Sequence, residues 1–61
     1  RRSDRLFQLV STLSDYALHR AEDLAQAQGV SLRTLYRDIA RLQTAGVPVA
    51  GTRGAGYRLT P

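Results

Sequence analysis

Apolar residues near the N-terminus recur at i, i+3, i+4 and i+7, the spacing of one helical face: Leu6, Leu9, Val10 and Leu13. We predict a helix over about residues 4–14, with this stripe in the core and Phe7 packing beside it. Ser3 is the expected N-cap because its hydroxyl can accept from an unpaired backbone N–H. Asp4 suits the positive end of the helix dipole.

A turn of three residues separates two further predicted helices, at about residues 21–28 and 32–45. Gly29 can end the first of them in the left-handed conformation, and Val30 can fill the core. Ser31 can then cap the helix that follows. A helix, a short turn containing glycine and a second helix are the pattern of a helix-turn-helix.

The helix predicted over residues 32–45 has two distinct faces. Its larger apolar side chains fall on one face, which we expect to lie in the core: Leu35, Ile39 and Leu42. Arginines four residues apart line another face, turned away from that core: Arg33, Arg37 and Arg41. Gly46 and Pro48 are the expected stop signals after this helix.

The C-terminal residues, about 47–60, predict two short strands joined by a glycine-rich loop. Pro48 cannot donate to a strand ladder, so the first strand is short or at an edge. Tyr57 is expected to close the core from the second strand, and residues 17–19 are a candidate for one further, very short strand. The predicted fold class is therefore mainly α with a small β-hairpin, that is, a winged helix-turn-helix of three helices plus a wing.

Length and composition allow one compact domain. The chain has 61 residues, of which 43% are hydrophobic, enough for a single small core. It has no cysteine, so packing alone must hold the fold, which suits a reducing cytoplasm as the expected location. No apolar run approaches the roughly 20 residues needed to cross a bilayer, and we expect no membrane association. The chain starts without Met and stops just after the second predicted strand, so we expect a further, C-terminal effector domain that is absent here.

The net charge of +4 belongs to the second half of the chain. Residues 1–30 hold four arginines and four acids, whereas residues 31–61 hold five arginines against Asp38 alone, and five minus one is the entire +4. One side of so small a domain is therefore cationic, as binding to a polyanion requires. All nine basic residues are arginine, whose planar fork suits bidentate contacts to guanine or phosphate.

The charged helix is the candidate reader of double-stranded DNA. An α-helix fits the major groove, and the N-terminal residues of the second helix of a helix-turn-helix usually meet base edges. The alternative is a solvated charged face on an ordinary amphipathic helix, and for the hairpin loop simply a tight turn. The predicted DNA contacts lie on this helix and at the hairpin tip: Ser31, Arg33, Thr34, Tyr36, Arg37, Arg41 and Arg53.

An acidic residue lies among these arginines. An unpaired carboxylate at Asp38 would repel phosphate, so we expect it to orient an arginine, with Arg5 and Arg58 as candidates. A direct contact from Asp38 to a base is the weaker alternative.

The sequence offers no catalytic or metal-binding constellation. His19 is the only histidine and has no cysteine beside it, so we expect a surface residue rather than a metal ligand. Residues 51–56 read GxxGxG, but no helix follows to supply a dipole for a nucleotide phosphate. We therefore predict no enzyme and no cofactor. The rival function is a protein-interaction module that docks its arginines on an acidic partner, and the sequence shows no exposed aromatic platform for RNA.

Three segments carry a family resemblance: S-x-R-T-x-x-R-D-I-x-x-L at residues 31–42, AGVPV at 45–49 and GYRL at 56–59. With them, nearly the whole chain resembles the N-terminal winged helix-turn-helix domain of YafY-like bacterial transcription regulators, which carry a WYL domain and are related to the DeoR type. The resemblance implies a C-terminal WYL region that senses a ligand, often proposed to be a nucleic acid or nucleotide, and that supports homo-oligomerisation.

By position, the recognition motif of that family falls on the start of the charged helix, with an acidic residue after it and an arginine in the wing: Ser31, Arg33, Thr34, Arg37, Asp38 and Arg53. The chain departs from the family at the start of the second helix. Such proteins commonly have a threonine cap there, whereas this chain has Arg20.

Overall fold

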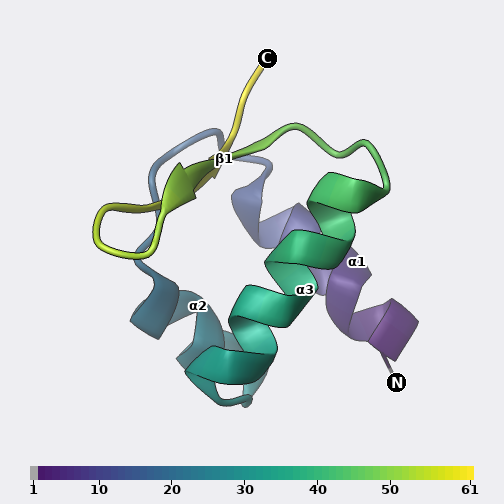
Figure 1. The fold of residues 1–61 in the computed structure, drawn as a ribbon, viewed down its shortest axis with the longest axis vertical. Helices are drawn as coiled ribbons and strands as arrows, with labels where there is room; N and C mark the ends of the chain where they lie inside the picture. The colour runs from purple at the N-terminus through teal and green to yellow at the C-terminus, as the bar shows by residue number, and fades with distance from the viewer. Residues whose placement is uncertain (1) are drawn as a thin grey trace.

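The computed structural model describes residues 2–61, and their side chains from residue 4 onward. Three helices precede one hairpin, in the order α1 (Arg2–Leu13), α2 (Ala21–Gln28), α3 (Leu32–Thr44), β1 (Val49–Thr52) and β2 (Gly56–Leu59). Figure 1 shows α3 crossing in front of α1, with α2 beside its first turns and the hairpin beyond α2. This arrangement confirms the predicted fold class, mainly α with a small β-wing.

The core lies where the three helices and the hairpin meet. Every element contributes side chains that are less than a tenth exposed: Leu9, Leu13, Ala21, Leu24, Ala25, Leu35, Ile39, Leu42, Val49, Tyr57 and Leu59. The inward face predicted for α3 and the core position predicted for Tyr57 are both confirmed. None of the helices in residues 2–61 is long and apolar enough to span a membrane.

The prediction that Phe7 packs into the core is wrong, since its side chain is 73% exposed. Phe7 precedes the buried Leu9 by two residues, and two residues turn an α-helix by about 200°. Its ring therefore points away from the stripe that enters the core. The helix itself begins at Arg2, so Ser3 lies within its first turn rather than at its cap. The side chain of Ser3 is outside the part of the chain that is described.

The turn between α2 and α3 has the geometry that the sequence predicted. Gly29 has a φ of 68° and ends α2 in the left-handed region, where glycine has no Cβ to clash. The backbone N–H of Val30 donates to the carbonyl of Ala25 at 3.0 Å, which closes the helix end. Ser31 caps α3, because its side-chain oxygen accepts from the backbone N–H of Thr34 at 3.2 Å. Local hydrogen bonds thus end α2 and begin α3 on the two sides of Val30.

The hairpin is joined to the segment before α2. Strands β1 and β2 pair antiparallel, with Val49 opposite Leu59 and Thr52 opposite Gly56. His19 adds a single bridge to Tyr57, in which each backbone N–H donates to the other residue's carbonyl at 2.8 Å. The very short strand predicted at residues 17–19 is therefore one bridge residue.

Candidate nucleic-acid interface

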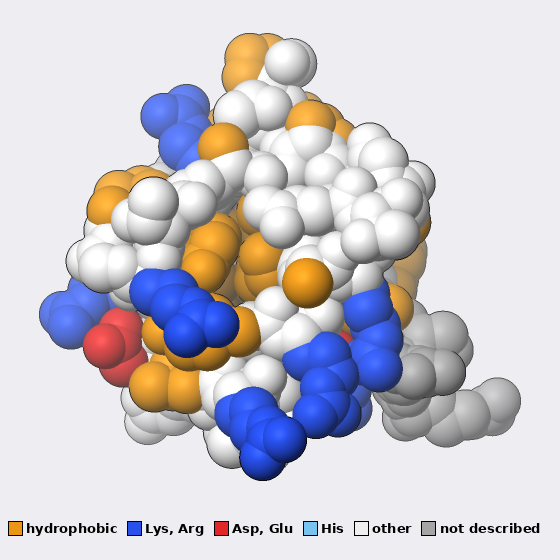
Figure 2. All heavy atoms as spheres, in the orientation of Figure 1, with side chains coloured by type: hydrophobic (Ala, Val, Ile, Leu, Met, Phe, Trp, Pro, Cys, Tyr) orange, Lys and Arg blue, Asp and Glu red, His pale blue; other side chains and the backbone are white. Residues whose placement is uncertain are grey.

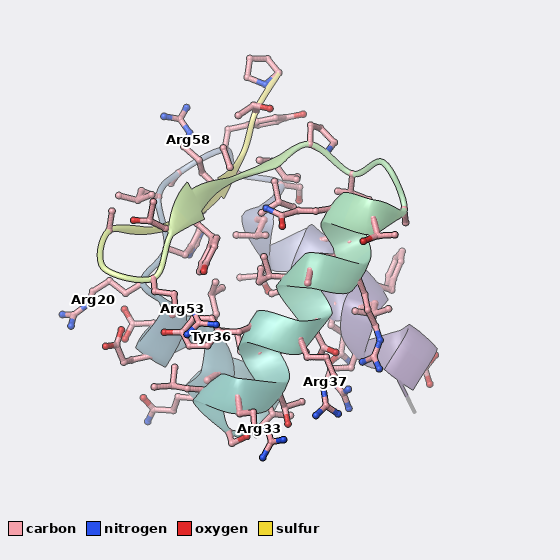
Figure 3. The ribbon with its side chains drawn as sticks, viewed as in Figure 1. Arg20, Arg33, Tyr36, Arg37, Arg53 and Arg58 are labelled. Carbon is pink, nitrogen blue, oxygen red and sulfur yellow. The ribbon has the colours of Figure 1, made fainter. Side chains whose placement is uncertain are left out.

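The exposed side of α3 carries the predicted arginines. Arg33 and Arg37 are exposed, and the side chain of Arg41 is 36% exposed. Figure 2 shows basic side chains gathered around this part of the surface. Figure 3 shows Arg33 and Arg37 extending outward from α3, on the side away from the hairpin. We call the set Arg33, Arg37, Arg41 and Arg53 the basic face. Burial of leucine and isoleucine on the opposite side of α3 positions its three arginines, and the hairpin loop supplies the fourth.

The first turn of α3 presents small polar groups next to the basic face. The Ser31 hydroxyl accepts from the Thr34 backbone N–H and donates to the Thr34 hydroxyl, both at 3.2 Å. Ser31 is exposed and Thr34 is half-buried. The two predicted contact residues therefore form one hydrogen-bonded pair at the end of the helix that a groove would meet first.

Asp38 is the buried carboxylate behind the basic face, with a side chain only 2% exposed. Arg5 of α1 donates to it through Nε at 2.6 Å and through a terminal nitrogen at 3.2 Å. Arg41 donates to the same carboxylate at 3.3 Å. The hydrogen bond to Asp38 raises the pKa of Arg5 above its ordinary value. The expectation that Asp38 orients an arginine is thus confirmed.

Of the two partners proposed for Asp38, Arg5 is right and Arg58 is wrong. Figure 3 shows Arg58 on the far side of the hairpin, directed away from α3. Strand β2 turns Tyr57 and Leu59 into the core, so the residue between them must face outward. The pairing of Arg41 with Asp38 was missed, although the i, i+3 spacing on one helix was a signal for it.

The hairpin arginine folds back onto α3. The guanidinium carbon of Arg53 lies 4.4 Å from the centroid of the Tyr36 ring, a cation–π arrangement. Tyr36 in turn meets Tyr57, with ring centroids 6.3 Å apart and planes tilted by 59°. Tyr36 is half-buried against the core rather than fully presented to solvent. Sequence reasoning placed Arg53 and Tyr36 in the same interface but had no signal for their contact.

His19 and Asp15 form a small polar pair in the segment before α2. The His19 Nε2 lies 2.8 Å from one carboxylate oxygen of Asp15 and 3.1 Å from the other. The hydrogen bond to His19, helped by the backbone N–H of Ala17, holds the pKa of Asp15 below its ordinary value. His19 also bridges to β2, so both of its contacts serve the fold. Within residues 2–61 no three acidic or histidine side chains are grouped as metal ligands.

The start of α2 departs from the usual capping pattern. Arg20 occupies the N-cap position and makes no side-chain capping hydrogen bond. The side chain of Arg20 lies 3.8 Å from that of Glu22, and both are largely exposed. The glycine-rich segment of residues 51–56 leads into β2 and not into a helix. This segment therefore lacks the helix dipole that a phosphate-binding loop uses.

The chain is similar to known sequences along most of its length. The family model described as an HTH domain matches residues 5–58, which include most of α1 and the whole of α2, α3 and β1. The uncharacterized HTH-type transcriptional regulator YobV of Bacillus subtilis (strain 168) is 38% identical over 53 residues. Those residues are 87% of this chain but 17% of that regulator, so the chain spans less than a fifth of its relative's length.

Proposed function

Because this chain belongs to the HTH domain family, we propose that it binds double-stranded DNA with α3 in the major groove. The observation that carries the proposal is the basic face itself. Arginines stand on the exposed side of α3 while Leu35, Ile39 and Leu42 bury the other side. The single carboxylate among them, Asp38, is buried and held by two arginines, so no free negative charge on α3 faces the phosphates.

The proposed contacts divide by position on α3. We assign the residues at its start to base edges, as is usual for helix-turn-helix proteins: Ser31, Arg33, Thr34 and Arg37. We assign Arg41, one turn further along, to the phosphate backbone. Arg53 of the hairpin loop is the candidate contact to a phosphate or to the adjacent minor groove. Tyr36 lies under Arg53 in the same surface.

The wider context we propose is a transcription regulator. The similarity to an HTH-type transcriptional regulator supports this role. The finer assignment, a reader domain of the YafY-like type in the bacterial cytoplasm, rests on the sequence motifs at residues 31–42 and 56–59. In such a protein a WYL region outside this chain would sense the ligand and join the copies, and two domains would then read two half-sites.

Fluorescence anisotropy with labelled duplex DNA tests the proposed function. Two to four arginines that each neutralise one phosphate, Arg41 and Arg53 with or without Arg33 and Arg37, give a slope of log K against log salt between about −1.8 and −3.6. We expect such a slope, together with enrichment of a shared motif when the domain selects from a random duplex library. Poly-glutamate is the control polyanion. Equal binding to poly-glutamate and to every duplex, with no enriched motif at low salt, would contradict DNA reading and favour the acidic-partner alternative.

A further inference from the structure

The arginine of the hairpin loop, Arg53, lies over the ring of Tyr36 on α3. We propose that Tyr36 is a positioning residue that holds Arg53 beside α3, so that wing and helix present one preformed surface to DNA. This inference rests on the proposed function, since it concerns how the same interface is organised. It assigns Tyr36 a role through Arg53 instead of the direct DNA contact that the sequence suggested.

The Tyr36 ring is a fixed platform. One side of it meets Tyr57, which is only 6% exposed and belongs to the core. Arg53 lies over the ring with its guanidinium carbon 4.4 Å from the centroid. Figure 3 shows Arg53 turned from the hairpin toward Tyr36, while Arg20 and Arg58 extend away from α3. Tyr57 is thus held by the core, Tyr36 packs against Tyr57, and Arg53 packs against Tyr36.

The contact with Tyr36 leaves N–H donors of Arg53 available. The guanidinium carries five N–H donors, and a cation–π contact with a ring face pairs none of them with a hydrogen-bond acceptor of the protein. Arg5 and Arg41, in contrast, each donate hydrogen bonds to Asp38. Among the side chains described from residue 4 onward and the backbone of residues 2–61, no group forms a hydrogen bond or ion pair with the Arg53 guanidinium. The contact therefore aims Arg53 and does not occupy the atoms that a phosphate or a base would need.

Holding Arg53 in advance lowers the entropy cost of binding. A free arginine side chain loses rotamer freedom when it is immobilised against a ligand, and ordering it in the unbound protein removes part of that loss. Arg53 is exposed and its loop is rich in glycine, so without the ring the side chain would sample many positions. The stacked state is therefore expected to persist in the DNA complex.

A double-mutant cycle with four chains tests the coupling: wild type, Tyr36→Leu, Arg53→Ala and the double variant. The probe is a fluorescein-labelled duplex selected by the wild-type chain from a random library. We expect Tyr36→Leu to weaken binding about 2- to 5-fold, the range of an exposed cation–π contact, and to reduce the effect of Arg53→Ala by the same factor. Tyr36→Phe keeps the ring and should bind within about 2-fold of wild type.

Arg58→Ala is the matched control, because it removes one hairpin arginine that lies outside the stack. Its effect on binding should be the same in the wild-type background and in the Tyr36→Leu background. A direct readout in the wild-type chain is the upfield ring-current shift of the Arg53 δ-methylene protons in NMR spectra. We expect this shift in the free protein and in the complex, and its loss in Tyr36→Leu.

Several outcomes overturn the inference while leaving DNA binding in place. They are additive effects of Tyr36→Leu and Arg53→Ala, tighter binding by Tyr36→Leu, or loss of the ring-current shift when wild type binds the duplex. Tyr36→Phe binding as weakly as Tyr36→Leu would instead assign the role to the hydroxyl. If Tyr36→Leu fails to fold, the wild-type NMR comparison and Tyr36→Phe still decide. Failure of wild type to bind any duplex overturns the proposed function and this inference together.

Discussion

At the residue scale, one buried carboxylate, Asp38, accepts hydrogen bonds from two arginines. Removing a charge from water is unfavourable unless partners replace the lost hydration. Asp38 has such partners in Arg5 of α1 and Arg41 of its own helix, with contacts between 2.6 and 3.3 Å. The contact with Arg5 ties α1 to α3 across 33 positions of sequence. Asp38 therefore serves the fold, and its burial keeps its negative charge off the exposed side of α3.

Replacing Asp38 with alanine should destabilise the domain by about 3 kcal/mol, because two partly exposed guanidinium groups lose their buried partner. The free energy of unfolding in urea measures the loss. Asp23→Ala is the control, since it removes an exposed carboxylate from the first turn of α2 and should cost at most about 1 kcal/mol. Equal losses in the two variants would contradict a structural role for the Asp38 contacts.

The hairpin and the segment before α2 form one unit at the scale of elements. The reciprocal hydrogen bonds of His19 and Tyr57 bring that segment against β2. Gly56, next to the bridge, has a φ of 114°, and a Cβ on it would lie 2.5 Å from the His19 carbonyl oxygen. Close backbone approach and a positive φ both require glycine at this position.

Gly56→Ala should therefore cost about 2 kcal/mol and lower Tm by roughly 10 °C, as the bridge or the strand must shift. Thermal unfolding followed by circular dichroism measures the change. Gly54→Ala is the matched control in the same hairpin, since an added Cβ there meets nothing within 4 Å. If the two alanine variants melt together, the bridge does not constrain the hairpin as the structure indicates.

At the scale of the whole molecule, a small chain buries an apolar core and still keeps charged side chains on its surface. Within 61 residues, the three helices and the hairpin share one core that buries the inner side of α3 and leaves its arginines outside. Arg37 and Arg41 lie one turn apart on that helix but differ in their surroundings. Arg37 is exposed, whereas Arg41 is bound to Asp38 and 36% exposed. This difference predicts different roles on DNA.

Arg41→Ala should weaken binding to all duplexes alike and reduce the salt slope by about 0.9, as expected for one lost phosphate contact. Arg37→Ala should also blur the preference at one base position, by about 1–3 kcal/mol. Selection from a random library followed by anisotropy on matched and mismatched duplexes measures both effects. An Arg37→Ala domain that keeps its full preference would remove the base-reading role from this residue.

Local signals in the sequence were sufficient for the fold class and for the surface that carries the arginines. The stripe of Leu35, Ile39 and Leu42 identifies the inner side of α3, and Gly29 and Ser31 identify its start. These signals act within a turn or two of chain, through helix periodicity and backbone capping, so they can be seen without knowing how the elements pack.

Packing alone decided the contacts between distant elements. Because of the packing, Asp38 pairs with Arg5 and not with Arg58, and Arg53 contacts the ring of Tyr36. Each of these contacts depends on how α1 crosses α3 or how the hairpin leans on the helices. Those orientations come from the combined fit of many side chains in the core, a property of the assembled chain that no single segment carries.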